Sequence, residues 1–289
     1  MLGHVSSAIC LKGKFQRGKR LLKKQLAAMM LSGVALAQPA KKEFEPSVGQ
    51  SGKDVVWVPT PQALVDRMLD MAKLTPQDVH YDLGSGDGRT VITAAKRGGK
   101  AFGIEYNPDM VEVARRAAQK EGVADKAIFK QGDIFTEASK KDYTQAAVIT
   151  LFLLPDLNVK LRPILLDMKP GTRVVSNSFT MGDWTEDEKI SAGGDCSSWC
   201  TAYLWIVPAK VAGSWKTSRG TLTLKQEYQM LTGSLANGNV SAIVSEAKMK
   251  ADQITFTAGG VQYTGRVNGT GIEGTFKSGA ENGKWTATK

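Results

Sequence analysis

A glycine-rich segment with an acidic residue at its start is the part of this chain best suited to bind a small molecule. The segment Asp-Leu-Gly-Ser-Gly-Asp-Gly occupies residues 82–88 and follows a short apolar run that begins at Val79. Glycine lets the backbone approach a ligand closely, and the start of a following helix offers free N–H groups. Glu105 ends the next apolar run, where an acidic side chain can hold ribose hydroxyls. The spacing therefore predicts a ligand that contains a nucleoside.

The residues around these glycines distinguish between two kinds of nucleoside ligand. The dinucleotide fingerprint Gly-x-Gly-x-x-Gly would need a glycine at position 89, where this chain has Arg89. Asp82 precedes the glycines, and its charge would repel a pyrophosphate. The same carboxylate can stabilise the ammonium group of a cationic ligand such as S-adenosylmethionine. The sequence therefore favours that ligand over a dinucleotide.

Three segments, in this order along the chain, resemble the donor-binding motifs of class I S-adenosylmethionine-dependent methyltransferases. They are residues 82–88, Gly-Ile-Glu at 103–105 and Gln-Gly-Asp-Ile at 131–134, within a resemblance that covers about residues 56–184. It implies that Glu105 binds the ribose, that Asp133 binds the adenine amino group and that the glycine loop holds the methionine part. The donor-binding residues implied are Asp82, Gly84, Ser85, Gly86, Gly88, Glu105, Tyr106 and Asp133.

A narrower resemblance points to one group of these enzymes. The segments Val-Pro-Thr-Pro at 58–61, Tyr-Asp-Leu-Gly-Ser-Gly-Asp-Gly-Arg at 81–89, Thr-Leu-Phe-Leu-Leu-Pro at 150–155 and Met-Gly-Asp-Trp at 181–184 carry it. Together they are similar to the protein-lysine methyltransferases of the ATP synthase c subunit and adenine nucleotide translocase type, and to their bacterial relatives. The resemblance implies N-methylation of a protein lysine or a similar amine. The N-terminal leader, a Cys-x-x-x-Cys segment and the C-terminal tail are not part of this pattern.

The residues after the fourth predicted strand indicate the kind of methyl acceptor. Enzymes that methylate the flat amino groups of adenine or glutamine place Asn or Asp before Pro-Pro and an aromatic residue there, whereas this chain has an apolar run. An apolar rim suits lysine, because desolvation lowers the pKa of an amine toward the neutral nucleophile. Ordinary packing explains Phe152 and Leu154 equally well. No general base is identified, and the acceptor-channel candidates are Thr150, Phe152, Leu154, Asp183 and Trp184.

The elements that would position these residues alternate between short apolar runs and helical segments. This alternation is typical of a Rossmann-like, doubly wound α/β sheet, which we expect over residues 55–210 as a methyltransferase domain. Thr60 and Asn107 are the expected caps of the first and third helices. The predicted strands are 79–83, 101–106, 127–131, 146–152, 173–179 and 202–207, and the predicted helices are 61–73, 89–97, 108–121 and 157–168.

Residues 213–289 have a different composition. Twelve of the thirty glycines of the chain separate segments in which apolar and polar residues alternate. Short strands joined by glycine-rich turns predict a small all-β antiparallel meander, either a barrel or a sandwich. This region has no His or Cys, so we expect a structural or binding domain without chemistry of its own.

The first 37 residues resemble an export signal. They hold seven basic side chains and no acidic one, so only +3 of the net charge of +10 belongs to the rest of the chain, too little to indicate nucleic-acid binding. An apolar run at 26–37 is shorter than the roughly 20 residues of a membrane span and ends in Ala-Leu-Ala. We predict a signal peptide cleaved after Ala37, a linker over 38–54 and a periplasmic protein without a stable membrane span. An uncleaved N-terminal anchor is the alternative.

Cys196 and Cys200 are the cysteines that remain after removal of the leader. They can form a small disulfide loop in an oxidising compartment or stay as two thiols. A metal site is not expected, because zinc needs about four ligands and the mature chain offers one histidine, His80.

Two other functions are compatible with the sequence. One is an exported protein that binds S-adenosylmethionine or a partner after losing catalysis, and the other is a small-molecule methyltransferase. The three acidic residues of the donor motifs favour ligand binding, whereas O-methylation lacks a His or Lys base beside them. The sequence does not indicate the oligomeric state.

Overall fold

A seven-stranded sheet carries the predicted donor motifs. The computed structural model describes residues 43–194 and 196–289; the predicted signal peptide and residues 38–42 of the predicted linker lie outside the described residues. The strand order is β3-β2-β1-β4-β5-β7-β6, and β1 to β5 run parallel while β7 is antiparallel to both its neighbours. The bounds are β1 Val79–Leu83, β2 Lys100–Glu105, β3 Ala127–Gln131, β4 Val148–Leu151, β5 Arg173–Asn177, β6 Glu188–Ser191 and β7 Thr201–Ile206.

This arrangement confirms the predicted Rossmann-like sheet, and each predicted strand is present to within two residues at each end. After β3 the chain crosses to the other side of β1 and continues with β4, so β1 and β4 flank the switch point of the sheet. In open α/β sheets, ligands bind beyond the carboxyl ends of the strands at such a point. The short edge strand β6 was not predicted, because most of its side chains are exposed and no apolar alternation marks it.

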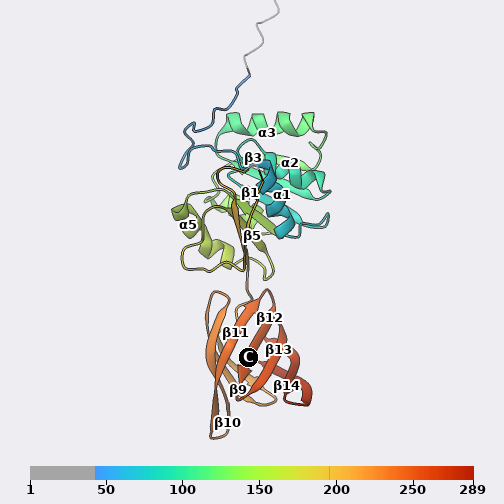
Figure 1. The fold of residues 1–289 in the computed structure, drawn as a ribbon, viewed down its shortest axis with the longest axis vertical. Helices are drawn as coiled ribbons and strands as arrows, with labels where there is room; N and C mark the ends of the chain where they lie inside the picture. Colours follow the sequence, from blue (N-terminus) through green and yellow to red (C-terminus); the bar gives the residue numbers. More distant parts are fainter. Residues whose placement is uncertain (1–42, 195) are drawn as a thin grey trace, which may run out of the picture. The chain divides into compact units, whose positions relative to one another are not determined.

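Among the described residues, α1 precedes the sheet and four helices, α2 to α5, connect β1 to β5; Figure 1 shows α1 to α3 packed beside the strands of the sheet. Asn107 caps α3 as predicted, since its side chain accepts a hydrogen bond from the backbone N–H of Asp109. The predicted cap of α1 is wrong: the Thr60 hydroxyl instead accepts a bond from the amide of Asn177. None of the described helices is long and apolar enough to cross a membrane. The bounds are α1 Gln62–Met71, α2 Arg89–Lys96, α3 Pro108–Lys120, α4 Glu137–Tyr143 and α5 Pro155–Leu166.

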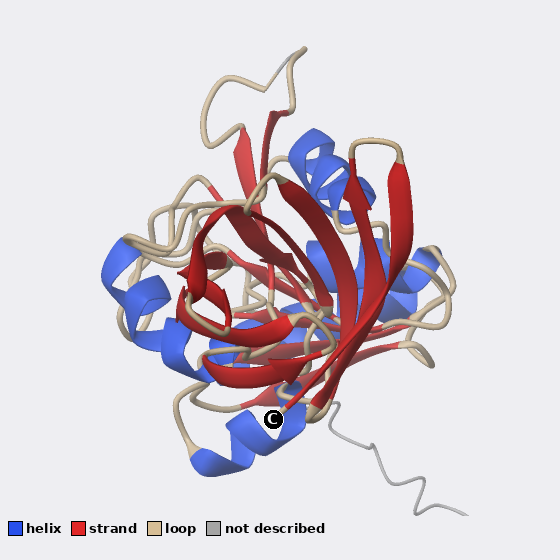
Figure 2. Ribbon diagram, turned by 90° about the horizontal axis from the view of Figure 1, so that it is seen from below, coloured by secondary structure: helices blue, strands red, loops and turns tan. Residues whose placement is uncertain are grey.

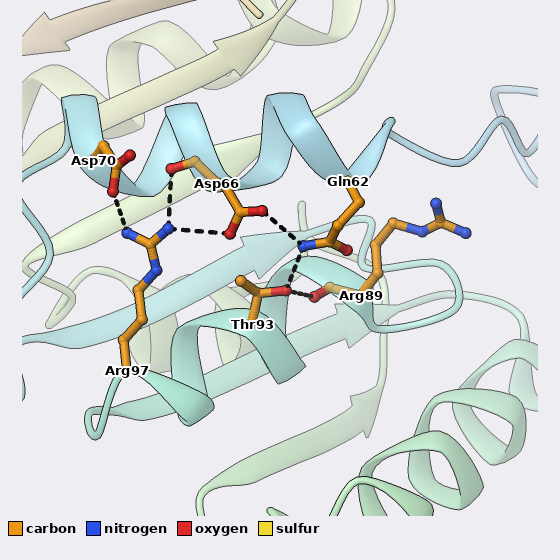
Figure 3. A network of polar contacts seen from close by, with 6 residues as sticks. All are labelled: Gln62, Asp66, Asp70, Arg89, Thr93 and Arg97. Atoms are coloured by element: carbon orange, nitrogen blue, oxygen red, sulfur yellow. Dashed lines mark hydrogen bonds and ion pairs between the residues drawn. The ribbon is translucent and has the colours of Figure 1, made fainter. Parts of the chain in front are cut away.

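Polar contacts hold α1 against α2 (Figure 3). The Arg97 guanidinium contacts the carboxylates of Asp70 at 2.6 Å and Asp66 at 3.1 Å, and the Gln62 amide donates to the Thr93 hydroxyl. Five buried apolar side chains of α1 pack on the sheet and on α2. This apolar packing determines which face of α1 points toward solvent. The segment that leads into α1 is thereby held beside the carboxyl edge of the sheet.

The C-terminal region is a closed antiparallel barrel, which decides between the two predicted β folds. Consecutive strands pair from β8 to β15, and β15 returns to pair with β8 at Ala287 and Thr217. Figure 2 shows the barrel strands curving around a common centre. Trp215, Phe256 and Trp285 are buried inside. The bounds are β8 Gly213–Thr217, β9 Gly220–Glu227, β10 Met230–Asn237, β11 Val240–Lys250, β12 Gln253–Ala258, β13 Val261–Asn268, β14 Gly271–Ser278 and β15 Glu281–Thr288.

The barrel and the seven-stranded sheet have separate apolar cores, which contact each other near Trp184. Ala209 and Val211 belong to the barrel core, so this core begins before the predicted boundary at residue 213, and Ala209 lies within the residues predicted for the methyltransferase domain. The Tyr228 ring stacks on Trp184 at 6.0 Å, and the Gln229 amide donates to the carbonyl oxygen of Thr185 at 2.8 Å. Trp184 is therefore covered in part by a residue of the barrel.

Candidate functional site

A cavity of about 520 Å³ lies at the carboxyl ends of β1, β2 and β4, beside the switch point of the sheet. This volume is within the range of about 300–1,000 Å³ that is usual for small-molecule sites. Seven of the eight predicted donor-binding residues line it. They are Asp82, Gly84, Ser85, Gly86, Glu105, Tyr106 and Asp133.

Hydrogen bonds that the glycine loop donates to acceptors of β2 shape the loop. The backbone N–H groups of Gly84 and Ser85 both donate to the carbonyl oxygen of Ile104, and that of Gly86 donates to the Glu105 carboxylate at 2.9 Å. The Glu105 side chain also accepts from the N–H of Asn107 at 2.9 Å. Both carboxylate oxygens keep a free lone pair, so Glu105 fits a ribose that donates from two hydroxyls.

Gly88 is the predicted donor-binding residue that does not line the cavity. It precedes α2 with φ +82°, and a Cβ atom there would lie 2.6 Å from the Phe129 ring and 2.8 Å from the Cβ atom of Ala114. These distances are too short for any side chain. Gly88 therefore does not line the cavity as expected, and its close contacts with Phe129 of β3 and Ala114 of α3 indicate that it lets these elements pack against the start of α2.

Asp82 is buried at the end of β1 in a chain of three polar side chains. Its carboxylate accepts from the Thr150 hydroxyl at 2.6 Å, and the same hydroxyl is 2.8 Å from Nε2 of His80. The pKa of Asp82 is raised to about 7, mainly by burial; the Thr150 bond opposes this rise, and the charges of Asp87 and Glu105 add to it. Burial also lowers the pKa of His80 to about 3, so the ring is neutral.

These hydrogen bonds indicate that Thr150 and His80 hold the Asp82 carboxylate in place. When Asp82 is ionised, Thr150 donates to it, and Nε2–H of His80 then donates to the Thr150 oxygen. Thr150 is fully buried and does not line the cavity, which corrects its expected place in an acceptor channel. The sequence did not reveal the role of His80, because a histidine inside an apolar strand carries no local signal of its partner.

Asp133 faces a lysine from the segment before α1. Its carboxylate lies 2.6 Å from Nζ of Lys53 and also accepts from the N–H of Phe135. Lys53 lowers the pKa of Asp133 and thus keeps it ionised. An ionised carboxylate accepts well from an adenine amino group, so this residue also fits its implied role.

The segment before α1, which contains Lys53, forms part of the cavity wall. The indole of Trp57 lies against the glycine loop, with Nε1 2.7 Å from the position of a Cβ atom on Gly86. Lys53 is also 5.1 Å from the ring centroid of Tyr106. Residues 50–60 line the cavity, whereas the sequence predicts a linker over residues 38–54. Lys53 and Trp57 were missed because no local pattern shows which distant loop a segment will cover.

The acceptor-channel candidates separate into two groups. Phe152 and Leu154 line the cavity as expected. Asp183 is exposed and paired with Arg162, and Trp184 is fully buried against Trp205 and Tyr228. The structure therefore does not bring Asp183 or Trp184 to the cavity, because the Trp184 ring fills the core beside the barrel.

Cys196 and Cys200 are joined by a disulfide in the loop before β7. Between them lies Trp199, which lines the cavity together with Phe152 and Phe179. The sequence predicted that the two cysteines could pair, but it did not predict that Trp199 between them lines the cavity.

The polar residues of the cavity fit S-adenosylmethionine. Asp82 offers a negative charge for the ammonium group, Glu105 offers acceptors for the ribose and Asp133 offers an acceptor for the adenine amino group. When bound, this molecule supplies a methyl group that its sulfonium has already activated.

The Glu105→Ala variant is expected to bind S-adenosylhomocysteine about 10- to 100-fold more weakly than the parent protein. It removes a charged acceptor worth about 1.5–3 kcal/mol, and it leaves the N–H of Gly86 without its partner. Isothermal titration measures the affinity. Glu112→Ala, on the exposed face of α3, is the matched control and should leave it unchanged. Equal affinities in the two variants would exclude Glu105 from the donor site.

Known proteins with similar sequences are methyltransferases. A family model described as the ANTKMT methyltransferase domain matches residues 82–188. A protein-lysine N-methyltransferase of Saccharolobus islandicus is 41% identical over 156 residues, which is 53% of this chain and 94% of that protein. The lysine N-methyltransferase of the ATP synthase c subunit from Rattus norvegicus is 36% identical over 115 residues. The chain spans about half (51%) of the length of this rat protein.

A solved structure is also similar to this chain. It is described as an RNA methyltransferase from Salinibacter ruber in complex with S-adenosyl-L-homocysteine. The two sequences are 47% identical, the match covers 53% of this chain and 96% of the other, and the TM-score is 0.48.

Proposed function

Because this chain belongs to the family of protein-lysine N-methyltransferases, we propose that it transfers a methyl group from S-adenosylmethionine to the side-chain amine of a protein lysine. The observation that carries the proposal is a single cavity with two chemically different parts. Asp82 and Glu105 give it a polar part for the donor, while Phe152 and Leu154 give it an apolar part beside the same loop. A lysine side chain, with its four methylenes and terminal amine, matches the apolar part.

The chain's own residues contribute binding and orientation to this reaction. In methyl transfer the amine nitrogen forms a bond to the methyl carbon as the sulfur–carbon bond breaks, and one proton leaves the nitrogen. An amine attacks only when neutral, and an apolar surrounding lowers its pKa toward that form. The protein thus gains most of its effect from aligning the two reactants in one cavity.

Mass spectrometry tests this function directly. The purified full-length protein is incubated with S-adenosylmethionine that carries a deuterated methyl group and with a mixture of lysine-containing peptides. We expect label on the ε-amino groups of lysine and none in a matched mixture with arginine in place of lysine. Label on an RNA transcript in a parallel reaction, with none on the lysine peptides, would contradict the proposal.

We also propose that the protein is exported to the periplasm after cleavage of the leader behind Ala37. The basic, apolar and small-residue parts of the leader support this, and so does the Cys196–Cys200 disulfide, since disulfides persist in oxidising compartments. After expression in a Gram-negative host, we expect the periplasmic fraction to contain a chain that begins at Gln38 and has no alkylatable thiol. An intact leader or two free thiols in that fraction would count against export.

We further propose that the barrel forms a separate domain that donor binding does not require. Its strands pair with one another in a closed ring, and the residues that line the cavity lie between 50 and 199. A fragment of residues 38–212 should therefore bind S-adenosylhomocysteine within about threefold of the full chain. Its midpoint of thermal unfolding should be lower, because loss of Tyr228 uncovers Trp184. An insoluble or non-binding fragment would show that the barrel belongs to the active unit.

A further inference from the structure

Three aromatic rings form one wall of the cavity, and each comes from a different loop. Phe152 follows β4, Phe179 follows β5 and Trp199 precedes β7. Their ring centroids lie 5.5–6.2 Å apart, so the rings contact one another, and all three line the cavity. We call these three residues the aromatic wall.

The aromatic wall lies next to the glycine loop. Leu153 follows Phe152 directly, and its Cδ2 atom is 3.0 Å from the position that a Cβ atom on Gly84 would occupy. Asp82 of β1 pairs with Thr150 of β4, and Phe152 follows β4, so Phe152 lies beside the glycine loop that follows β1. A side chain that lies along the wall reaches the part of the cavity where the donor's charged end is expected.

The backbone of Trp199 has a conformation that is uncommon for residues other than glycine. Its φ is +57°, in the left-handed region, and such a backbone persists in residues other than glycine only where surrounding structure holds it. Its side chain is 43% exposed, so much of the indole remains free. The neighbouring serines of the loop are exposed. The contacts that can hold the indole in place are the rings of Phe152 and Phe179 and the disulfide that closes residues 196–200.

We propose that the aromatic wall binds the acceptor lysine and its methylated product, and that the Cys196–Cys200 disulfide positions Trp199 in this wall. The inference rests on the proposed function and names the surface on which its acceptor binds. Aromatic faces attract alkylammonium groups, and the methylenes of lysine pack against the same rings. Lysine arrives protonated and its methylated product is also a cation, so the wall suits both, and the bound amine loses its proton before it attacks. A closed loop of five residues restricts where the indole can lie, whereas an open loop lets it leave.

The test uses a small probe in place of the unidentified acceptor. Nα-Acetyl-Nε-trimethyllysine amide carries the charged product group, and Nα-acetylnorleucine amide is a neutral probe with a similar stem. Both are titrated by NMR into the full-length protein saturated with S-adenosylhomocysteine. The charged probe should bind more tightly than the neutral one. Trp199→Ala should weaken its binding about tenfold, Trp199→Phe should restore part of the loss, and the control Ser197→Ala should have no effect.

The disulfide is tested by the double variant Cys196→Ser/Cys200→Ser and by the parent protein after reduction. Both should lose affinity for the charged probe as Trp199→Ala does, while affinity for S-adenosylhomocysteine stays within twofold of the parent. An unchanged probe affinity in these samples would overturn the positioning role of the disulfide. An unchanged affinity in Trp199→Ala, or an equal loss of S-adenosylhomocysteine binding, would overturn the wall.

The same titration separates this inference from the proposed function. A parent protein that binds the charged probe through Trp199, yet labels no lysine peptide with a deuterated methyl group, would contradict the proposed reaction and still support the wall as an alkylammonium-binding surface. A parent protein that labels lysine but does not distinguish the two probes would support the reaction and overturn the wall.

Discussion

Asp82→Asn is expected to stabilise the fold at pH 8 and to weaken donor binding in the same protein. Burial raises the pKa of Asp82 from 3.8 to about 7, which corresponds to a cost on the order of 4 kcal/mol for holding the charge in the folded state at pH 8. The amide of Asn still accepts from Thr150 without carrying that charge. We expect a net gain of about 1–3 kcal/mol in the free energy of unfolding, since part of the cost of burying a polar group remains.

The pH dependence gives this prediction a definite sign. The folded pKa of Asp82 is raised above its unfolded value, so its contribution favours folding below about pH 4 and is lost as the pH rises through about 7. The stability advantage of Asp82→Asn should therefore be absent at pH 4, grow between pH 4 and 7, and be complete at pH 8. Denaturant unfolding at the three pH values measures it.

Donor binding should change in the opposite direction. At pH 8 the variant loses the charge that faces the ammonium group, and we expect affinity for S-adenosylmethionine to fall about 10- to 100-fold. Asp142→Asn, whose carboxylate is paired with Lys130 outside the cavity, is the control for a change of net charge. A variant that binds the donor as well as this control does would remove Asp82 from the site. A variant without a gain in stability at pH 8 would contradict a buried, charged Asp82.

Gly88→Ala should be the most destabilising single methyl addition in the glycine loop. Its left-handed backbone costs a non-glycine residue about 1–2 kcal/mol, and overlap with Phe129 and Ala114 adds about 1–3 kcal/mol of overpacking. The total, about 2–5 kcal/mol, approaches the whole stability of many domains. Chemical denaturation, monitored by circular dichroism, measures the loss.

Gly122→Ala separates the two parts of that loss. Gly122 also has a positive φ, +68°, but no described atom outside its chain neighbours lies within 4 Å of a Cβ atom placed there. This control should lose only the backbone cost, about 1–2 kcal/mol. Equal losses in the two variants would mean that close packing of α2 and α3 does not depend on Gly88.

The sequence was sufficient to predict the parts of the fold that repeat a local pattern. The parallel strands are short apolar runs bounded by turn residues. In the barrel strands, apolar and polar residues alternate, and glycine-rich turns separate the strands. Both kinds of strand therefore follow from periodicity. The helix α4 and the strand β6 were missed, because they are short, largely polar and stabilised by their neighbours. Local pattern also left the choice between barrel and sandwich open, since only pairing of β15 with β8 distinguishes them.

The sequence predicts a site residue correctly where the residue belongs to a known motif. It does not predict residues that reach the site only through tertiary packing. Glu105 and Asp133 line the cavity because a residue at the end of a parallel strand necessarily reaches the carboxyl edge. Two tryptophans show the limit: Trp184 belongs to a motif but is buried in the core, whereas Trp199 belongs to no motif and lines the cavity. Which large apolar residue faces a cavity depends on the packing of distant segments.

Isothermal titration of the full-length protein with S-adenosylmethionine tests the central claim most directly, namely that the cavity bounded by Asp82, Glu105 and Asp133 is the donor site. We predict one binding site per chain and loss of measurable binding in the folded double variant Asp82→Asn/Glu105→Ala. Circular dichroism of the same samples confirms that the variant is folded. No binding by the parent protein, or undiminished binding by the folded double variant, would contradict the account.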